Sequence, residues 1–150
     1  MDNLIISDIY EHDFYAWSVK NAELIRQGRW EEIDQENVAE ELEYMGRREK
    51  RELVSRLAVL LAHLLKWQFK PERQSNSWKY TIENQREEVS ELLEDSPSLR
   101  YEIEDRLAKA YKKALRTAAR ETGIRKSSFP ETCPFSFEET LDDNFFPEQS

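Results

Sequence analysis

The chain has 150 residues and a mass of 18.0 kDa, the usual size of one domain. Glycine occurs only three times, and charged residues make up 35% of the sequence, with a net charge of −9. Few glycines and many Glu, Lys and Arg favour long helices and argue against a turn-rich β-sandwich or barrel. Hydrophobic residues make up 39%, enough for a modest core, so we expect a folded protein.

The first predicted helix covers about residues 7–26, where apolar side chains recur at helical spacing. Gly28 follows it and is a suitable stop, because glycine readily adopts the conformation that ends a helix. The next residues, 29–33, form a short link. We expect Trp30 in this link to pack into the fold.

A long second helix is predicted over residues 34–70. Asp34 is a suitable N-cap, and Pro71 ends the helix because proline disfavours helical geometry in the residue before it. A bend is expected at Gly46. Residues 58–65 are apolar on nearly every side, which is typical of the central helix of a bundle.

Two more helices follow in the sequence. Ser77 is a suitable N-cap for a helix that reaches about Glu94. Ser96 and Pro97 then start the last long helix, because proline suits the first helical position. Gly123 is its expected end.

The remaining residues, 124–150, are rich in Phe and Pro, and we expect this tail to wrap on the bundle. Ser136 and Glu139 form a capping-box pattern, which predicts one helical turn there. The predicted fold is all-α: an antiparallel helical bundle over about residues 7–123, with one long central helix and an irregular aromatic-rich tail. We expect residues 1–150 to form one domain.

Charge is distributed in blocks along the chain. Residues 31–43 hold seven acids and no base, and residues 47–73 hold eight bases and three acids. Residues 83–105 hold nine acids and two bases, and residues 109–126 hold seven bases and one acid. Antiparallel helices with opposite charges would associate favourably. A basic groove for nucleic acid is the alternative, which the net charge of −9 disfavours.

Several familiar catalytic and binding motifs are missing from the sequence. With three isolated glycines it contains no phosphate-binding glycine loop, and it has neither an HExxH nor a CxxC motif. Di-iron bundles carry Glu-x-x-His, but the residues three before His12 and His63 are Ile9 and Leu60. We therefore predict no metal and no cofactor. The lone cysteine and the absence of a signal peptide or a membrane-spanning apolar run favour a cytoplasmic protein with no membrane partner.

The candidate catalytic residues are polar side chains on strongly apolar helices. His63 lies in the most hydrophobic turn, where a histidine is either a hydrogen-bonded core residue or a general base with a shifted pKa. Lys66 follows one turn later, so both side chains can share one cleft. Glu40 and Glu41 are candidates for a general base, and Arg86 for binding a carboxylate or phosphate. We expect Glu40, His63 and Arg86 to approach one another in the fold.

A second set of polar residues predicts a binding surface. Ser77, Thr81 and Gln85 recur every four residues along one helix face, and the alternative is an ordinary solvated surface. The set consists of Asp34, Asn37, Arg73, Ser77, Trp78 and Gln85.

Six segments carry a resemblance to a known family: DFYAW at 13–17, DQENVAEELEYMG at 34–46, HLLKWQFKPER at 63–73, SWKYTIENQR at 77–86, SPSL at 96–99 and CPF at 133–135. Together they resemble the bacterial Domain of Unknown Function 29 family, which is abundant in cyanobacteria. The resemblance covers about residues 10–147 and implies an all-helical cytoplasmic protein with no assigned activity. The candidate residues above occupy the polar motif positions of the family, which fits a shared site or a shared buried network.

Three functions are compatible with these patterns. The first is a small protein-interaction or regulatory module, whose partner is another protein or a second copy of the chain. The second is an enzyme acting on nucleic acid or a phosphate-bearing substrate, since Arg56 and His63 have the spacing of the helical HEPN ribonucleases. A role as one half of a toxin–antitoxin pair is compatible with both the first and the second function. The third is a metal- or ligand-binding bundle that uses Glu40, Glu41 and His63.

Overall fold

The computed structural model describes residues 6–149, and this part of the chain contains helices and connecting segments but no strand. The all-α fold predicted from composition is confirmed. The chain divides into two compact units, residues 1–49 and 50–150. The boundary falls inside α3 (Gln35–Phe69), so this helix contributes its first half to one unit and its second half to the other.

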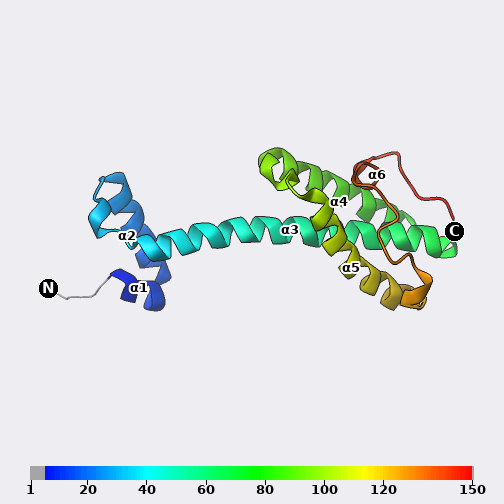
Figure 1. Ribbon diagram of the computed structural model, residues 1–150, viewed down its shortest axis with the longest axis horizontal. Helices are drawn as coiled ribbons and strands as arrows, with labels where there is room; N and C mark the ends of the chain where they lie inside the picture. Colours follow the sequence, from blue (N-terminus) through cyan, green and yellow to red (C-terminus); the bar gives the residue numbers. More distant parts are fainter. Residues whose placement is uncertain (1–5, 150) are drawn as a thin grey trace. The chain divides into compact units, whose positions relative to one another are not determined.

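The first unit contains α1 (Ile6–His12), α2 (Phe14–Arg26) and the start of α3, with a 3-10 turn, η1 (Trp30–Glu32), between α2 and α3 (Figure 1). The prediction of one helix over residues 7–26 is wrong. The helix is interrupted at Asp13, which separates α1 from α2. The Asp13 side chain accepts a hydrogen bond from the backbone N–H of Ala16 at 3.1 Å and so caps α2.

The end of α2 and the start of α3 follow the local signals. Gly28 has a φ of +68°, a left-handed conformation that favours glycine, directly after the helix. Asp34 precedes the first residue of α3 and caps it as predicted. The helix continues through Gly46 to Phe69. Trp30 does not pack into the fold, because 58% of its surface is exposed.

The second unit is a bundle of the second half of α3, α4 (Asn76–Asp95) and α5 (Ile103–Thr122), with the short α6 (Phe137–Leu141) in the tail. Figure 1 shows α4 running back beside α3, and α5 returning in the opposite direction. The core is apolar and continuous. Its fully buried side chains are Leu53, Leu57, Leu60, Leu61, Leu64, Leu65, Ile82, Val89, Ala110, Ala114 and Ala118.

Two helix starts in the second unit differ from the prediction. The N-cap of α4 is Ser75 rather than Ser77, and its hydroxyl accepts from the backbone N–H of Trp78 at 3.2 Å. Pro97 starts only a 3-10 turn, η3 (Pro97–Arg100). The helical backbone cannot continue into α5, because Glu102 adopts a left-handed conformation with a φ of +56°. The predicted end of α5 at Gly123, with a φ of +77°, is confirmed.

Aromatic side chains anchor the tail to the second unit. Phe129, Phe135 and Phe137 are buried in the core cluster, and the Tyr111 hydroxyl donates to the carbonyl of Pro130 at 2.6 Å. The capping box that precedes Phe137 forms as predicted. Among the helices of residues 6–149, none has an apolar stretch long enough to cross a lipid bilayer.

Candidate functional site

Asp34 is the centre of a buried hydrogen-bond network in the first unit. One carboxylate oxygen accepts from Trp17 Nε1 and from Asn37 Nδ2, both at 2.8 Å. The backbone N–H of Asp34 donates to Asn21 Oδ1 at 2.9 Å. These contacts join α2 to the start of α3, so the predicted binding residues Asp34 and Asn37 help to set the register of two helices.

The surroundings of Asp34 also shift the pKa of its carboxyl group. Burial by itself raises the pKa of this carboxyl, but the hydrogen bonds from Asn37 and Trp17 outweigh it and lower the pKa below the usual range. Asp34 therefore stays ionised although only 8% of its surface is exposed to solvent.

The two candidate glutamates of the first unit have different surroundings. Glu41 accepts a hydrogen bond from the Tyr10 hydroxyl at 2.6 Å. This bond, together with burial and the charges of Glu41 and Glu40, raises the pKa of Tyr10 to about 12. Glu40 is exposed and forms no ion pair with any residue of the described chain.

Lys66 is the centre of a second cluster, in the second unit. Its side chain is buried, and Nζ donates to Glu121 Oε1 at 2.7 Å and lies 5.0 Å from the centre of the Trp78 ring. His63 Nδ1 lies 2.9 Å from the carbonyl oxygen of Val59, and burial is the main reason why the pKa of His63 is lowered. The structure thus brings together three predicted residues, Lys66, His63 and Trp78, around a salt bridge.

Glu121 was not a candidate in the sequence, although one signal pointed to it. It is the single acid in the basic block of residues 109–126. Its hydrogen bond with Lys66 is the main reason why the pKa of Glu121 is lowered.

We expect Glu121→Gln to lower the free energy of unfolding by about 1–2 kcal/mol, because it leaves the buried Lys66 ammonium without a counter-charge. Urea denaturation followed by circular dichroism measures the change. Since the folded pKa of Glu121 is lowered, its contribution is full above the ordinary carboxyl pKa and disappears as the pH falls through the folded pKa. The exposed Glu131→Gln is the matched control. Equal stability of the two variants would show that Lys66 does not need this partner.

Arg86 fastens the C-terminal segment to α4. Its guanidinium donates from Nε to the carbonyl of Thr140 at 2.9 Å, and from Nη2 to the carbonyls of Phe145 at 2.7 Å and Glu139 at 3.4 Å. It also lies over the ring of Phe146 at 5.3 Å. Arg86 is 1% exposed, and burial lowers the pKa of its guanidinium. These contacts are those of a residue that fixes the tail in place.

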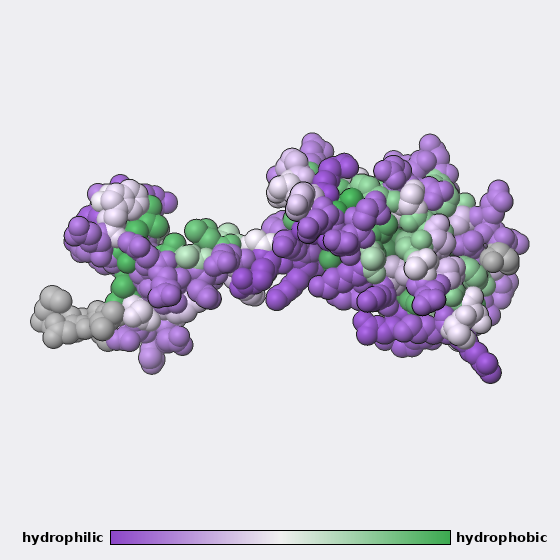
Figure 2. All heavy atoms as spheres, viewed as in Figure 1, coloured by the Kyte–Doolittle hydropathy of each residue, from purple (hydrophilic) through white to green (hydrophobic). Residues whose placement is uncertain are grey.

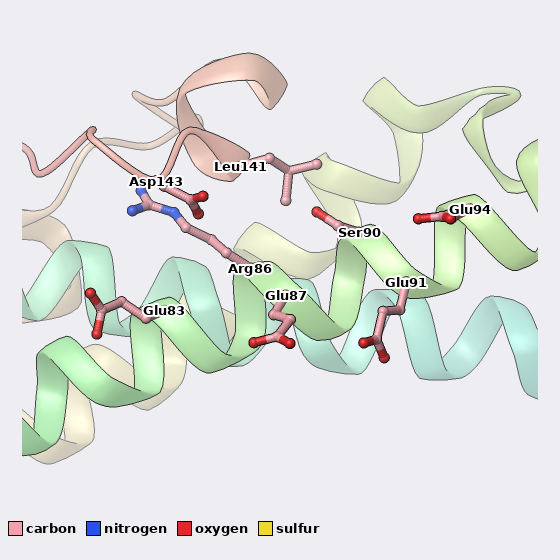
Figure 3. Close-up of a pocket in the computed structure, with 8 residues that line it drawn as sticks. All are labelled: Glu83, Arg86, Glu87, Ser90, Glu91, Glu94, Leu141 and Asp143. Carbon is pink, nitrogen blue, oxygen red and sulfur yellow. The ribbon is translucent and has the colours of Figure 1, made fainter.

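A groove lies beside Arg86, with a volume of about 580 Å³, and we call it the acidic groove. Its lining residues are Glu83, Arg86, Glu87, Ser90, Glu91 and Glu94 of α4, Leu141 of α6, and Asp143 (Figure 3). Figure 3 shows Arg86 reaching toward Asp143, and Glu83, Glu87 and Glu91 extending from the same side of α4. Five acidic residues line this hollow, and Figure 3 shows the carboxylates of Glu87 and Glu91 on the side of α4 away from Leu141 and Asp143.

Arg86 is the basic residue in the lining of the acidic groove, and its charge acts on Asp143 and Glu83 without forming an ion pair with either. No ion pair within residues 6–149 includes any of the five. Glu83, Glu87 and Glu91 are spaced by four residues, and like charges at this spacing destabilise a helix by about 0.2–0.5 kcal/mol per pair. A cationic ligand in the groove would remove this repulsion.

The other predicted residues lie apart from this groove. Gln85 accepts from Arg56 Nη1 at 3.5 Å, and Arg56 also pairs with Glu88 and Glu52. Arg73 and Ser77 are exposed.

The expected approach of Glu40, His63 and Arg86 to one another stays a prediction. His63 and Arg86 have separate sets of partners within the second unit, and Glu40 belongs to the first unit. Residues 6–149 contain no group of three or more His, Cys, Asp or Glu side chains arranged to hold a metal ion.

Comparison with known proteins gives the family. A family model described as domain of unknown function DUF29 matches residues 9–146, which is nearly the whole chain. The chain belongs to DUF29. The resemblance of the six sequence segments is thereby confirmed. No curated protein and no solved structure matches the chain.

Proposed function

We propose that the protein is a protein-interaction module whose acidic groove binds a basic segment of a partner protein. The observation that carries the proposal is the set of five acidic residues that line one groove, without an ion pair to any residue in the described part of the chain. Lys or Arg side chains of a partner would supply the missing charge, and charge complementarity of this kind gives specificity and fast association.

The shape of the acidic groove supports the same partner. One wall is the C-terminal segment, which Arg86 holds to α4 through three carbonyl groups. A wall that is already ordered reduces the entropy lost on binding. Leu141 adds an apolar contact, which suits the methylene chain of a lysine or arginine.

The same carboxylates disfavour nucleic acid as a ligand of the groove, because they repel phosphate groups. The ribonuclease interpretation stays a prediction. The side chain of Arg56 is held by Glu52 and Glu88, and His63 faces a main-chain carbonyl.

We expect the full chain to bind a fluorescein-labelled peptide with lysine at every fourth position, measured by fluorescence anisotropy at low salt. The double variant Glu87→Gln, Glu91→Gln should weaken binding about three- to tenfold, since an exposed ion pair contributes about 0.2–1 kcal/mol. Raising the salt concentration should weaken binding of the wild-type chain as well.

The matched control is Glu131→Gln, Glu148→Gln, which removes the same net charge from exposed positions outside the groove. It should bind the peptide as the wild type does. Equal weakening by both double variants would mean that the peptide responds only to net charge, and would contradict the groove as the binding site. Undetectable binding of the wild type would contradict the proposed function itself.

A further inference from the structure

Most of the exposed large hydrophobic residues belong to the first unit. Within residues 6–149, eight of the eleven exposed large hydrophobic residues lie in it. Figure 2 shows apolar atoms at its surface, including along its part of α3. These eight residues are Phe14, Tyr15, Val19, Ile25, Trp30, Leu42, Tyr44 and Met45.

Part of this surface forms a regular stripe on α3. Val38, Leu42 and Met45 are spaced by four and three residues, which places them on one face of the helix. Leu42 is 63% exposed and Met45 is 59% exposed. Apolar residues at alternating spacings of four and three form the contact seam when two helices pair along their length.

Gly46 lies on the same face, one turn after Leu42. A glycine inside a helix costs about 1 kcal/mol relative to alanine. Apart from the adjoining residues and backbone of its own helix, no heavy atom of the described chain lies within 4 Å of a Cβ built at Gly46, so no other part of the chain needs the space. A second helix that approaches closely would need it, because glycine lets two backbones come together.

The charges beside the stripe decide the orientation of such a partner helix. Glu40 and Glu41 precede Leu42, the centre of the stripe, and Arg47 and Arg48 follow its last residue, Met45. Within the described residues neither arginine forms an ion pair. A parallel copy would place acids beside acids, whereas an antiparallel copy places each arginine pair beside Glu40 and Glu41.

We propose that two copies of the chain associate through this stripe, with their α3 helices antiparallel. Leu42 of one copy lies beside Met45 of the other, and Gly46 lies at the close contact. The partner is a second copy of this chain, because its charge order complements itself. This surface is separate from the acidic groove and does not depend on it.

Sedimentation velocity of the full chain tests the proposal. We expect the mass to rise from 18.0 kDa toward twice that value with concentration, up to about 200 μM, since a contact along a few helical turns belongs to the small, weak interfaces. Met45→Glu and Gly46→Leu should each weaken association at least tenfold. Circular dichroism verifies that both variants stay folded, as their exposed positions predict.

Gly46→Leu separates close helix packing from general apolar adhesion, because it adds apolar surface while filling the space of the close contact. Association as strong as in the wild type, or stronger, would overturn the proposal. A wild-type chain that stays monomeric at all concentrations would overturn it too. Tyr80→Glu, at a 67% exposed position of the second unit, is the control and should leave association unchanged.

Disulfide cross-linking tests the orientation in a Cys133→Ser background. A mixture of Leu42→Cys chains and Met45→Cys chains should form a cross-linked pair, because the antiparallel register brings these two positions within disulfide reach. Each variant alone should remain uncross-linked. Efficient cross-linking of Leu42→Cys with itself would indicate parallel helices and overturn the antiparallel arrangement.

Discussion

Replacing Arg86 by methionine is expected to lower the free energy of unfolding of the second unit by about 3–5 kcal/mol, and the melting temperature of that unit by about 10 °C. The variant keeps most of the side-chain volume but removes the donors to the carbonyls of Glu139, Thr140 and Phe145. Two of these bonds are short enough to be strong, and a hydrogen bond to a charged group contributes more than one between neutral groups. Thermal denaturation followed by circular dichroism measures the effect.

Hydrogen exchange measured by mass spectrometry locates the loss. Amides of residues 129–146 should exchange faster in Arg86→Met, because their anchor on α4 is gone. Arg100→Met is the control: Arg100 is exposed and lies over the ring of Phe137 at 5.7 Å, so its loss should cost less than about 1 kcal/mol. If Arg86→Met were as stable as Arg100→Met, Arg86 would not be the anchor of the tail.

The second large effect is expected in the first unit. Asp34→Ala removes the N-cap of α3 and leaves the indole N–H of Trp17 without its acceptor. Loss of a cap costs about 1 kcal/mol and an unsatisfied buried donor about 1–3 kcal/mol, so we expect a loss of about 2–4 kcal/mol. Asp34→Asn retains a cap and an acceptor, and should lose less than half as much.

The loss should appear as faster hydrogen exchange in α1, α2 and the first turns of α3. The pKa of Asp34 is lowered in the folded chain, so its ionised form stabilises the fold above the ordinary aspartate pKa. This stability disappears as the pH falls through the folded pKa, and Asp34→Asn should lack that pH dependence. Unchanged exchange in Asp34→Ala would show that the network around Asp34 contributes little.

Local signals in the sequence were sufficient for much of the fold. Asp34 and Pro71 bound the long helix, and Gly123 ends α5, because each acts on its own neighbouring backbone. The break at Asp13 was missed, since an aspartate inside a helical pattern can equally be a solvated surface residue. Glu102 was missed for a related reason: a left-handed glutamate has no recognisable signal.

The candidate site was harder to predict because its contacts join distant parts of the chain. Lys66 and Glu121 are separated by 55 residues, and helical spacing carries no information over such a distance. Arg86 binds main-chain carbonyls, which every residue possesses, so no sequence pattern identifies its partners. The acidic block of residues 83–105 did point to charge on α4, but it did not show which carboxylates share a groove.

The unequal cores of the two units have a consequence for unfolding. Among residues 6–49 the buried hydrophobic side chains are Trp17 and Leu24, whereas the large cluster from Leu53 onward belongs to the second unit. Opening of the first unit therefore exposes little apolar surface and costs less free energy than global unfolding. Because α3 runs through both units, we expect its amide protection to increase along the helix, so that a single two-state transition does not describe the whole chain.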